Sequence, residues 1–496
     1  MTELDISPRK KVADGVEQSR AVATAPSTKQ KDYVKRIKLY PKLAKGFFRN
    51  IKWLALVVLL GIYYVTPWIR WDRGPGQPDQ AILIDFENAR FYFFFIEIWP
   101  QEIYYLTGLM IIAALGLFLA TALFGRVWCG YACPQTIWTD LFISVERFFE
   151  GDRNARMKLD KAPWSAKKLG KKTGKHIVWV IISALTGGVW ILYFHDAPTI
   201  ARDFFTGHAP ATSYIFAAIM TFTTYALAGF MREQVCTYMC PWPRIQAAMI
   251  DEEALNVTYR YDRGEPRGAH KKNATWDGRG DCIDCRQCVA VCPVGIDIRD
   301  GLQLECIGCS LCIDACDAIM VKVGRPKGLI AFDTDTNVQL RAEGKEGKIN
   351  LVRPRTVIYA VLISAIGALL LYGLMTRSLL DMNVLRDRQP NYVRLSDGSI
   401  RNGYTVKVLN KATTPRTLSL AVDTLENPVI SFAGHRDSEG YVMQVPADET
   451  RDFKIYITVP DVSGLGQKSD MMLILTDSKT GEVTQTRAIF ISGGAK

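Results

Sequence analysis

The chain has 496 residues, which is too long for one hydrophobic core and predicts several domains. Apolar residues make up 48% and charged residues 22%, an average that excludes both a disordered chain and a transporter that is nearly all membrane. The formal net charge of +11 could indicate nucleic acid, anionic lipid or membrane topology, and the positions of the charges decide between them.

The first segment, residues 1–47, is polar, basic and poor in aromatic side chains. Such a composition cannot bury enough apolar surface to fold. It therefore predicts a disordered cytoplasmic tail that could touch membrane lipid.

Five stretches are apolar enough, and about long enough at ~20 residues, to cross a bilayer as helices. A long polar segment precedes the first and no small-residue cleavage site follows it, so it is interpreted as a retained span and not as a signal peptide. Four spans occupy residues 48–255 and the fifth lies within 351–378. The predicted spans are Ile51–Ile69, Ile103–Phe124, His176–Phe194, Tyr214–Met231 and Thr356–Met375.

The distribution of Lys and Arg predicts the orientation of these spans. Residues 1–50 carry twelve and residues 125–175 carry eleven, whereas residues 70–102 carry three and residues 195–213 carry one. Because basic loops stay in the cytoplasm, the N-terminus is predicted inside and everything after Met375 outside. The positive charge is thus a topology signal and does not indicate nucleic acid.

A short motif occurs twice at the predicted cytoplasmic boundary. Cys129-x3-Cys133 follows the second span and Cys236-x3-Cys240 follows the fourth, each continued by a proline. The proline suits the first position of a new helix, so Cys133 and Cys240 are predicted at helix N-termini, where the dipole acidifies a thiol. The two pairs are predicted to converge as a four-thiolate site for Cu(I), iron or another sulfur cluster. The competing interpretation is four small buried residues that pack a helix corner.

Residues 256–350 hold the other eight cysteines in two Cx2Cx2Cx3C runs, the spacing of a bacterial two-cluster ferredoxin. Three close thiolates hold three corners of a cubane and the fourth crosses to the other cluster, which predicts two [4Fe–4S] clusters; zinc is the competing interpretation of such pairs. Asp317 stands where the first run has Pro293, which relaxes the turn without removing a ligand. One cluster is assigned to Cys282, Cys285, Cys288 and Cys316, and the other to Cys306, Cys309, Cys312 and Cys292.

The last segment, residues 379–496, consists of short runs rich in Val, Ile, Thr and Phe, separated by turn residues. This pattern suits an immunoglobulin-like sandwich, here without a disulfide or a core Trp. A linker at 321–350 precedes the fifth span and leads the chain back to the membrane. The predicted strands are Tyr404–Leu409, Thr417–Val422, Val429–Phe432, Tyr441–Val445, Asp452–Val459, Met471–Leu475 and Thr484–Ile491.

These features predict a multidomain membrane protein: a five-span α-helical membrane domain, an inserted α+β two-cluster ferredoxin and a C-terminal all-β immunoglobulin-like sandwich. The combination resembles the CcoG/FixG/RdxA family, accessory proteins of cbb3-type cytochrome oxidase assembly. The resemblance implies a bacterial inner membrane and a cupric reductase, an oxidoreductase that supplies Cu(I) to copper-insertion or oxidase assembly factors. Electrons from a cytoplasmic donor would enter the ferredoxin domain and meet copper at or near the catalytic candidates Cys129, Cys133, Cys236 and Cys240.

Two other functions remain open at the level of sequence. One is an electron conduit to a quinone or to an outer redox partner, as in membrane ferredoxins that share the CxxxCP and double-cluster features. The other is a non-redox assembly scaffold, in which the clusters are structural and the outer β domain binds oxidase subunits.

Overall fold

The computed structural model forms two compact units. The first unit runs to Asp72 and from Pro78 to Leu370, and the second comprises Arg73–Gln77 and Leu371–Lys496. Most of the predicted disordered tail, residues 1–37, lies outside the described residues. The structure describes residues 38–74, 77–270, 276, 278–434, 442–461 and 464–493.

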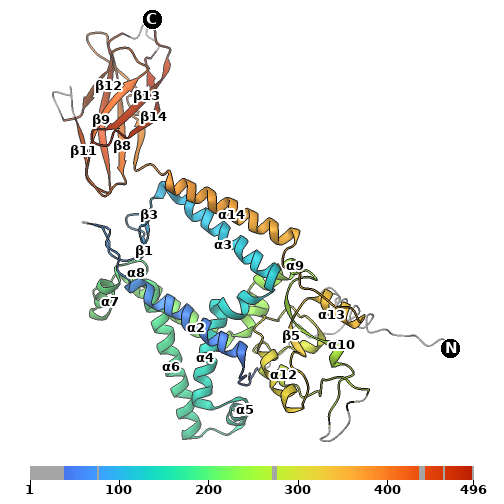
Figure 1. The fold of residues 1–496 in the computed structure, drawn as a ribbon. Coiled ribbons are helices and arrows are strands. Elements are labelled where there is room, and N and C mark those ends of the chain that lie inside the picture. Colours follow the sequence, from blue (N-terminus) through green and yellow to red (C-terminus); the bar gives the residue numbers. More distant parts are fainter. Residues whose placement is uncertain are drawn as a thin grey trace, which may run out of the picture. The chain divides into compact units, whose positions relative to one another are not determined.

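Five helices are long and apolar enough to cross a membrane (Figure 1). The fifth of them continues past Leu370, where the first unit ends. Their side chains are largely unburied, as for Leu54 and Leu369, which are 65% and 68% exposed. Apolar side chains that face outward along a whole helix suit lipid, so the chain is a membrane protein. The five helical spans are α2 (Phe47–Val65) with its extension to Trp68, α3 (Ile103–Phe124), α6 (Ala166–Ile191), α8 (Ala211–Thr224) continued by η4 (Tyr225–Met231), and α14 (Pro354–Met375).

Helix α6 begins well before the predicted start at His176. The Ser165 hydroxyl accepts a hydrogen bond from the Lys168 backbone N–H at 3.2 Å, which caps the helix at Ala166. The basic residues before the apolar stretch are therefore helical, and Lys175 is buried among acidic partners. Hydropathy located the span but not this polar first part of the helix.

The two loops predicted outside carry structure that the sequence did not indicate. Strands β1 (Ile82–Asp85), β2 (Arg90–Phe93) and β3 (Ile96–Ile98) form an antiparallel sheet in the first loop. Helix α7 (Ala197–Thr206) forms in the second loop, and its Ala197 N–H donates to the buried Gln80 Oε1 at 2.9 Å. The two loops therefore pack against each other at one end of the helices.

The opposite end is built from short elements that follow α3 and η4. The π-helix η3 (Trp128–Ala132) leads into α4 (Pro134–Glu150), and the π-helix η5 (Val235–Met239) leads into α9 (Trp242–Met249). α5 (Arg153–Lys161) follows α4. The predicted helix start at Pro134 is confirmed, whereas α9 starts one residue after Pro241, which lies at the N-cap position.

The ferredoxin segment contains two short helices, each carrying cluster cysteines, beside a two-stranded sheet of β4 (Asn256–Tyr259) and β5 (Ile330–Asp333). Pro293 follows the end of α11 (Gln287–Val291), whereas α12 (Leu311–Lys322) runs on past Asp317 because no proline stops it. The Asp317 carboxylate instead accepts the Gly328 N–H at 2.8 Å. Further short elements are α10 (Tyr261–Gly264), η6 (Ile298–Asp300) and α13 (Asp335–Ala342).

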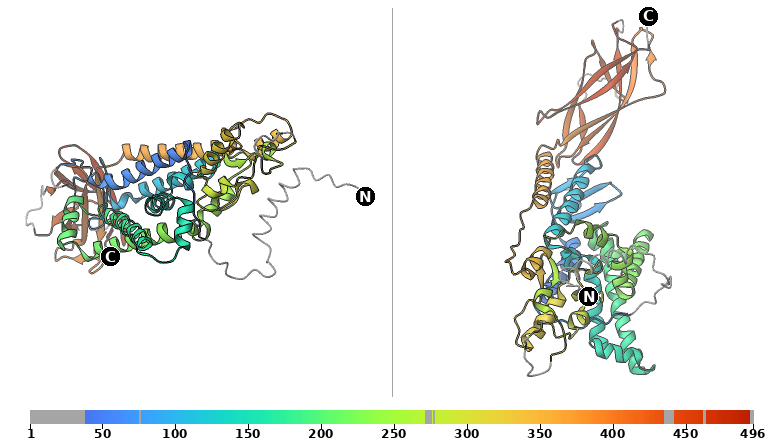
Figure 2. Two further views of the ribbon diagram at one scale, coloured as in Figure 1. Left: turned by 90° about the horizontal axis from the view of Figure 1, so that it is seen from below. Right: turned by 90° about the vertical axis from the view of Figure 1, so that its right-hand side faces the viewer.

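The second unit is a sandwich of two antiparallel sheets, seen as two layers in Figure 2. One sheet has the order β10-β12-β8-β6 with β7 paired to β8, and the other has the order β11-β9-β13-β14. The predicted immunoglobulin-like class is confirmed, while β6 and β7 were not predicted and Tyr441 lies outside the described residues. The strands are β6 (Leu380–Arg386), β7 (Val393–Arg394), β8 (Ile400–Asn410), β9 (Arg416–Asp423), β10 (Val429–Phe432), β11 (Met443–Val445), β12 (Glu449–Val459), β13 (Lys468–Asp477) and β14 (Val483–Ile491).

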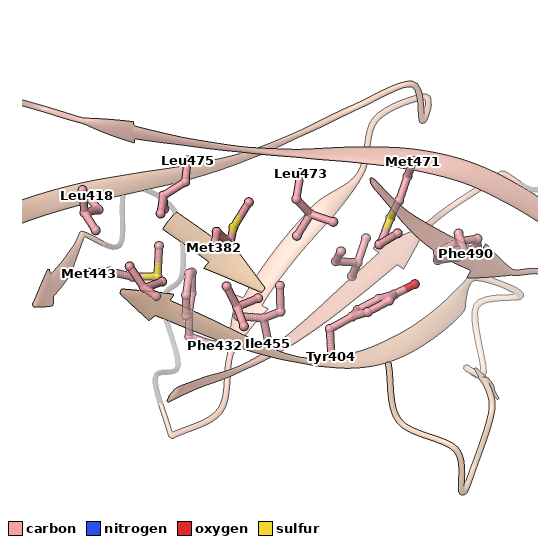
Figure 3. Packing of buried hydrophobic residues seen from close by; sticks show 14 of the residues in the cluster. Met382, Tyr404, Leu418, Phe432, Met443, Ile455, Met471, Leu473, Leu475 and Phe490 are labelled. Carbon is pink, nitrogen blue, oxygen red and sulfur yellow. The ribbon is translucent and has the colours of Figure 1, made fainter. Parts of the chain in front are cut away.

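The core of this sandwich replaces a disulfide and a tryptophan with aliphatic and sulfur-containing side chains. Leu418, Leu473, Ile455 and Phe490 are fully buried between the sheets (Figure 3). Tyr404 is also buried, and its hydroxyl donates to the Ile489 carbonyl at 2.9 Å, so its polar atom is satisfied. The alternation of buried and exposed positions along β8 is the period-two pattern from which the strand was predicted.

Candidate metal centres

The first predicted cluster set surrounds one cavity of the ferredoxin segment. Cys282, Cys285, Cys288 and Cys316 all line it, together with Arg299. Burial raises the pKa of the Cys288 thiol to about 11 and, together with the three neighbouring thiols, that of Cys316 to about 12. The fourth ligand thus comes from α12, across the segment from the other three, as the interleaved assignment requires.

The second predicted set surrounds an adjoining cavity. It is lined by Cys306, Cys309, Cys312 and Cys292, and Cys288 lies in the shared wall. Burial raises the pKa of the Cys306 thiol to about 11, although the Gly308 N–H donates to its sulfur at 3.4 Å. Neutral thiols of this kind bind metal by losing their protons.

The donor sets fit two [4Fe–4S] clusters. Each cavity offers four soft sulfur donors among apolar walls, to which β4 contributes Val257 on one side and Tyr259 on the other. Asp284 and Ser310 adopt positive φ, which lets the backbone turn tightly beside the ligands. When bound, such clusters supply one-electron transfer.

The four remaining thiols lie in the two π-helical turns. Cys129 is within η3 and Cys236 within η5, while Cys133 and Cys240 are the residues at which those turns end. Cys133 has extended backbone geometry and forms the N-cap of α4. π-Helical turns concentrate at functional sites, and the sequence repeat is therefore also a structural repeat.

The two repeats converge on one surface of the ferredoxin segment. Cys129 and Cys236 both pack against a buried apolar group that contains Cys309. The pKa of the Cys129 thiol is raised to about 12, mainly by burial. The neighbouring thiols of Cys133, Cys236 and Cys240 also raise this pKa, whereas Arg126 lowers it. Of the predicted quartet Cys129, Cys133, Cys236 and Cys240, the structure thus packs one thiol from each motif, Cys129 and Cys236, against the same ferredoxin surface.

Burial also raises the pKa of the Cys236 thiol, to about 11, with contributions from Cys133 and Cys240. The predicted acidification concerns Cys133 and Cys240 and stays a prediction. Within the described residues, no three Cys, His, Asp or Glu side chains form a group that could hold a single metal ion. Neither the eight ferredoxin thiols nor the quartet forms such a single-ion group. Copper at the quartet therefore stays a prediction.

One partner of the quartet had no signal in the sequence. Gln246 on α9 is fully buried, and its Oε1 accepts from the Cys129 thiol at 3.2 Å. Its Nε2 donates to the Thr121 hydroxyl on α3 at 3.3 Å. An isolated glutamine in an amphipathic stretch is uninformative, and only the packing of α9 against α3 reveals its place.

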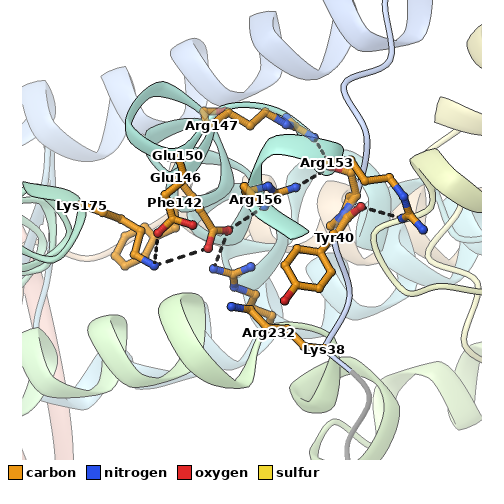
Figure 4. Close-up of polar contacts among 12 residues, drawn as sticks. Lys38, Tyr40, Phe142, Glu146, Arg147, Glu150, Arg153, Arg156, Lys175 and Arg232 are labelled. Carbon is orange, nitrogen blue, oxygen red and sulfur yellow. Dashed lines mark hydrogen bonds and ion pairs between the residues drawn. The ribbon is translucent and has the colours of Figure 1, made fainter. Parts of the chain in front are cut away.

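A buried ionic cluster holds the second repeat against α4 (Figure 4). The Glu146 carboxylate lies 3.0 Å from Arg232 and 2.8 Å from Arg156. Burial raises the pKa of Glu146, but Arg232, Arg156 and Lys175 more than offset this and lower it to about 2. Glu146 is therefore a carboxylate at neutral pH, and it holds Arg232, which lies just before η5.

The segment from Lys38 to Arg49 ties the ferredoxin to the helices. Its Lys42 N–H donates to the Ala290 carbonyl at 2.8 Å, and the Arg49 N–H donates to Asp314 at 2.8 Å. Asp314 lies on α12 between two cluster cysteines, so the start of α2 is capped by the ferredoxin itself.

Three family models match parts of this chain. Residues 231–335 match a 4Fe-4S dicluster domain, and residues 106–172 match a 4Fe-4S binding domain. Residues 370–493 match the Ig-like fold at the C-terminal of FixG. The two iron–sulfur matches include the two CxxxCP motifs as well as the ferredoxin runs.

Relatives match almost the whole length. The nitrogen fixation protein FixG of Rhizobium meliloti is 49% identical over 493 residues, covering 93% of this chain and 94% of that protein. Protein RdxB of Cereibacter sphaeroides is 49% identical over 482 residues, covering 95% and 100%. The crystal structure of a FixG-related protein from Vibrio parahaemolyticus covers 23% of this chain and 96% of that chain, at 23% identity and a TM-score of 0.20.

Proposed function

The chain belongs to the FixG family of membrane iron–sulfur proteins, and we propose that it is an oxidoreductase that reduces Cu(II) to Cu(I). In this proposal, the ferredoxin segment receives electrons and the quartet Cys129, Cys133, Cys236 and Cys240 presents the copper substrate. The Cu(I) product would be passed to copper-insertion or cbb3-type oxidase assembly factors.

One observation carries this proposal: the backbone of a CxxxCP motif touches the backbone of a cluster-binding loop. A Cβ atom added to Gly130 would lie 2.8 Å from the Gly308 carbonyl oxygen and 3.0 Å from the Cys309 Cα. The Tyr131 hydroxyl donates to the Cys309 carbonyl at 3.3 Å. No side chain separates the two loops at this point, so an electron would have a short path between the two kinds of thiolate centre.

The chemistry of the quartet suits the product of the reaction. Cu(I) is a soft ion that favours thiolates over oxygen ligands. Cys129 and Cys236 are half-buried against the ferredoxin surface and belong to separate repeats. Buried thiols lose their protons only when a metal compensates the charge, so copper binding there would release protons.

We place the chain in a bacterial inner membrane with its N-terminus in the cytoplasm and its C-terminal sandwich in the periplasm. The support is the asymmetry of Lys and Arg between alternate loops. All twelve cysteines then lie on the cytoplasmic side, where thiols stay reduced.

The test is anaerobic purification in detergent, reduction with dithionite, removal of the excess reductant and addition of Cu(II). We expect about two Cu(I) per chain, one for each one-electron cluster, formed together with bleaching of the iron–sulfur absorbance. Reduction of a quinone analogue with no reduction of copper would instead support the electron conduit. Clusters that dithionite cannot reduce would support the scaffold.

A further inference from the structure

The side chain of Arg126 lies between the ferredoxin segment and the CxxxCP quartet. It follows the end of α3 and is only 5% exposed. Its guanidinium donates to the carbonyl oxygens of Leu304 and Cys306, the latter at 3.0 Å, and to the Pro243 carbonyl at 3.0 Å. One side chain thus joins a cluster-binding loop to the first turn of α9, which follows the second CxxxCP motif.

Arg126 differs from other arginines near these centres in what balances its charge. Arg232 pairs with Glu146, and Arg299 pairs with two aspartates. Across the part of the chain that the structure describes, Arg126 forms no ion pair with a carboxylate, and the carboxylate that acts on it, Glu305, is exposed at the surface. A buried guanidinium without a close counter-charge is strongly disfavoured.

Thiolates supply the missing negative charge. Cys306 and Cys129 both lie close enough to the Arg126 guanidinium that their ionised forms would stabilise its charge. Cys306 belongs to the second ferredoxin set, and Cys129 belongs to the quartet. When Cys306 is ligated in its cluster it carries negative charge, so the buried arginine is balanced from the ferredoxin side, and Cys129 would add to this if metal occupied the quartet.

We propose that Arg126 is a positioning residue that favours the electron on the cluster held by Cys306, Cys309, Cys312 and Cys292. A nearby positive charge stabilises the reduced, more negative cluster more than the oxidised one, and the effect falls with distance. This cluster is therefore the one from which electrons leave toward the quartet. In that last step, which rests on the proposed function, the cluster loses one electron and Cu(II) gains it to become Cu(I), without any change in covalent bonds or protons.

The test is a potentiometric titration of the anaerobically purified full-length protein, followed by electron paramagnetic resonance without copper. Arg126→Gln removes the charge and keeps amide donors, so one cluster potential should become more negative. We expect the equilibrium constant for electron transfer between the two clusters to change at least tenfold. This corresponds to a shift of about 59 mV in the difference between their one-electron potentials. Arg126→Lys keeps the charge on a shorter side chain and should move the same potential less.

Arg299→Gln is the matched control, because Arg299 lines the other cavity. It should move the other potential. The proposal is overturned if Arg126→Gln moves neither potential, moves both equally, or moves the one that Arg299→Gln moves, and also if Arg126→Lys shifts it as much as Arg126→Gln.

If Arg126→Gln does not retain iron, Arg126→Lys decides alone: a shift confined to the cluster that Arg299→Gln leaves unchanged supports the proposal, and any other result overturns it. Copper takes no part in these measurements. Failure of Cu(II) reduction would therefore overturn the proposed function and leave the role of Arg126 standing.

Discussion

The ferredoxin thiols and the CxxxCP thiols are specified in different ways. The eight ferredoxin cysteines lie between Cys282 and Cys316, and each set of four surrounds its own cavity. The quartet comes from two turns that are far apart in sequence, and its members Cys129 and Cys236 reach the same ferredoxin surface because η3 and η5 both pack there. Local spacing encodes a cluster-binding loop, whereas the quartet depends on the tertiary fold.

Electron transfer between the two groups of thiols depends first on the membrane topology. A test of this topology has an all-or-none outcome. Both groups of thiols must face the same compartment, which the five-span arrangement predicts from the Lys and Arg distribution. Reporter fusions after Lys175 and after Arg388 should therefore report opposite compartments. If both reporters were found in the same compartment, the five-span arrangement would be wrong. The ferredoxin segment and the quartet could then face different compartments.

Serine substitutions should separate the two groups by their effect on iron. Cys288→Ser or Cys306→Ser should lower the iron content from about eight to about four per chain, because each removes a ligand of one cluster. Cys129→Ser with Cys236→Ser should keep all the iron and slow Cu(II) reduction at least about tenfold, since serine lacks the soft donor. Iron analysis and Cu(I) formation measure the two effects.

The contrary result is equally clear. A stable variant that lacks all four CxxxCP thiols and still reduces Cu(II) at the parent rate would move the reaction to the ferredoxin surface. Zinc in place of iron in the parent protein would contradict the clusters themselves.

The contact between the two groups can be disturbed without touching a thiol. Gly130→Ala places a Cβ 2.8 Å from the Gly308 carbonyl oxygen, so two backbones must move apart. We expect the iron to be retained and Cu(II) reduction to slow about tenfold, because small displacements at a reaction centre are costly. Gly170→Ala on α6 is the matched control, since its Cβ would meet nothing within 4 Å. Equal rates for the two variants would show that this contact carries no electron.

The sequence predicted those parts of the fold that repeat at short range. Apolar stretches gave the five spans, alternation gave the strands of the sandwich, and cysteine spacing gave the clusters. It did not predict β6, which directly follows the fifth span and pairs with β8, or the burial of Gln246 beside Cys129. These depend on contacts between segments that are distant in the chain, for which a single sequence has no periodic signal.

Substitution of Glu146 tests whether the buried ionic cluster on α4 supports the quartet through Arg232. Its carboxylate holds Arg232, which precedes η5, and both side chains are buried. Glu146→Gln leaves buried cations without their partner and should lower the stability of the first unit by about 3 kcal/mol at pH 7, the usual cost of breaking a buried pair. The iron content should remain unchanged, and Cu(II) reduction should change less than in Gly130→Ala. Thermal loss of helical circular dichroism in detergent measures the stability.

The pH dependence of this difference identifies the charge as its cause. The three cations lower the pKa of Glu146 to about 2 from its ordinary 4.5, in spite of the opposing effect of burial. A carboxyl group whose pKa is lower in the folded state stabilises the fold fully above the unfolded value and loses this effect as the pH falls toward the folded value. The stability gap between the parent and Glu146→Gln should therefore be constant near neutral pH and narrow below about pH 4.5. Lys345→Gln, which removes a partly exposed pair with Glu343, should change stability little at any pH. A gap for Glu146→Gln that stays constant down to pH 3 would show that packing, and not charge, connects α4 to the second repeat.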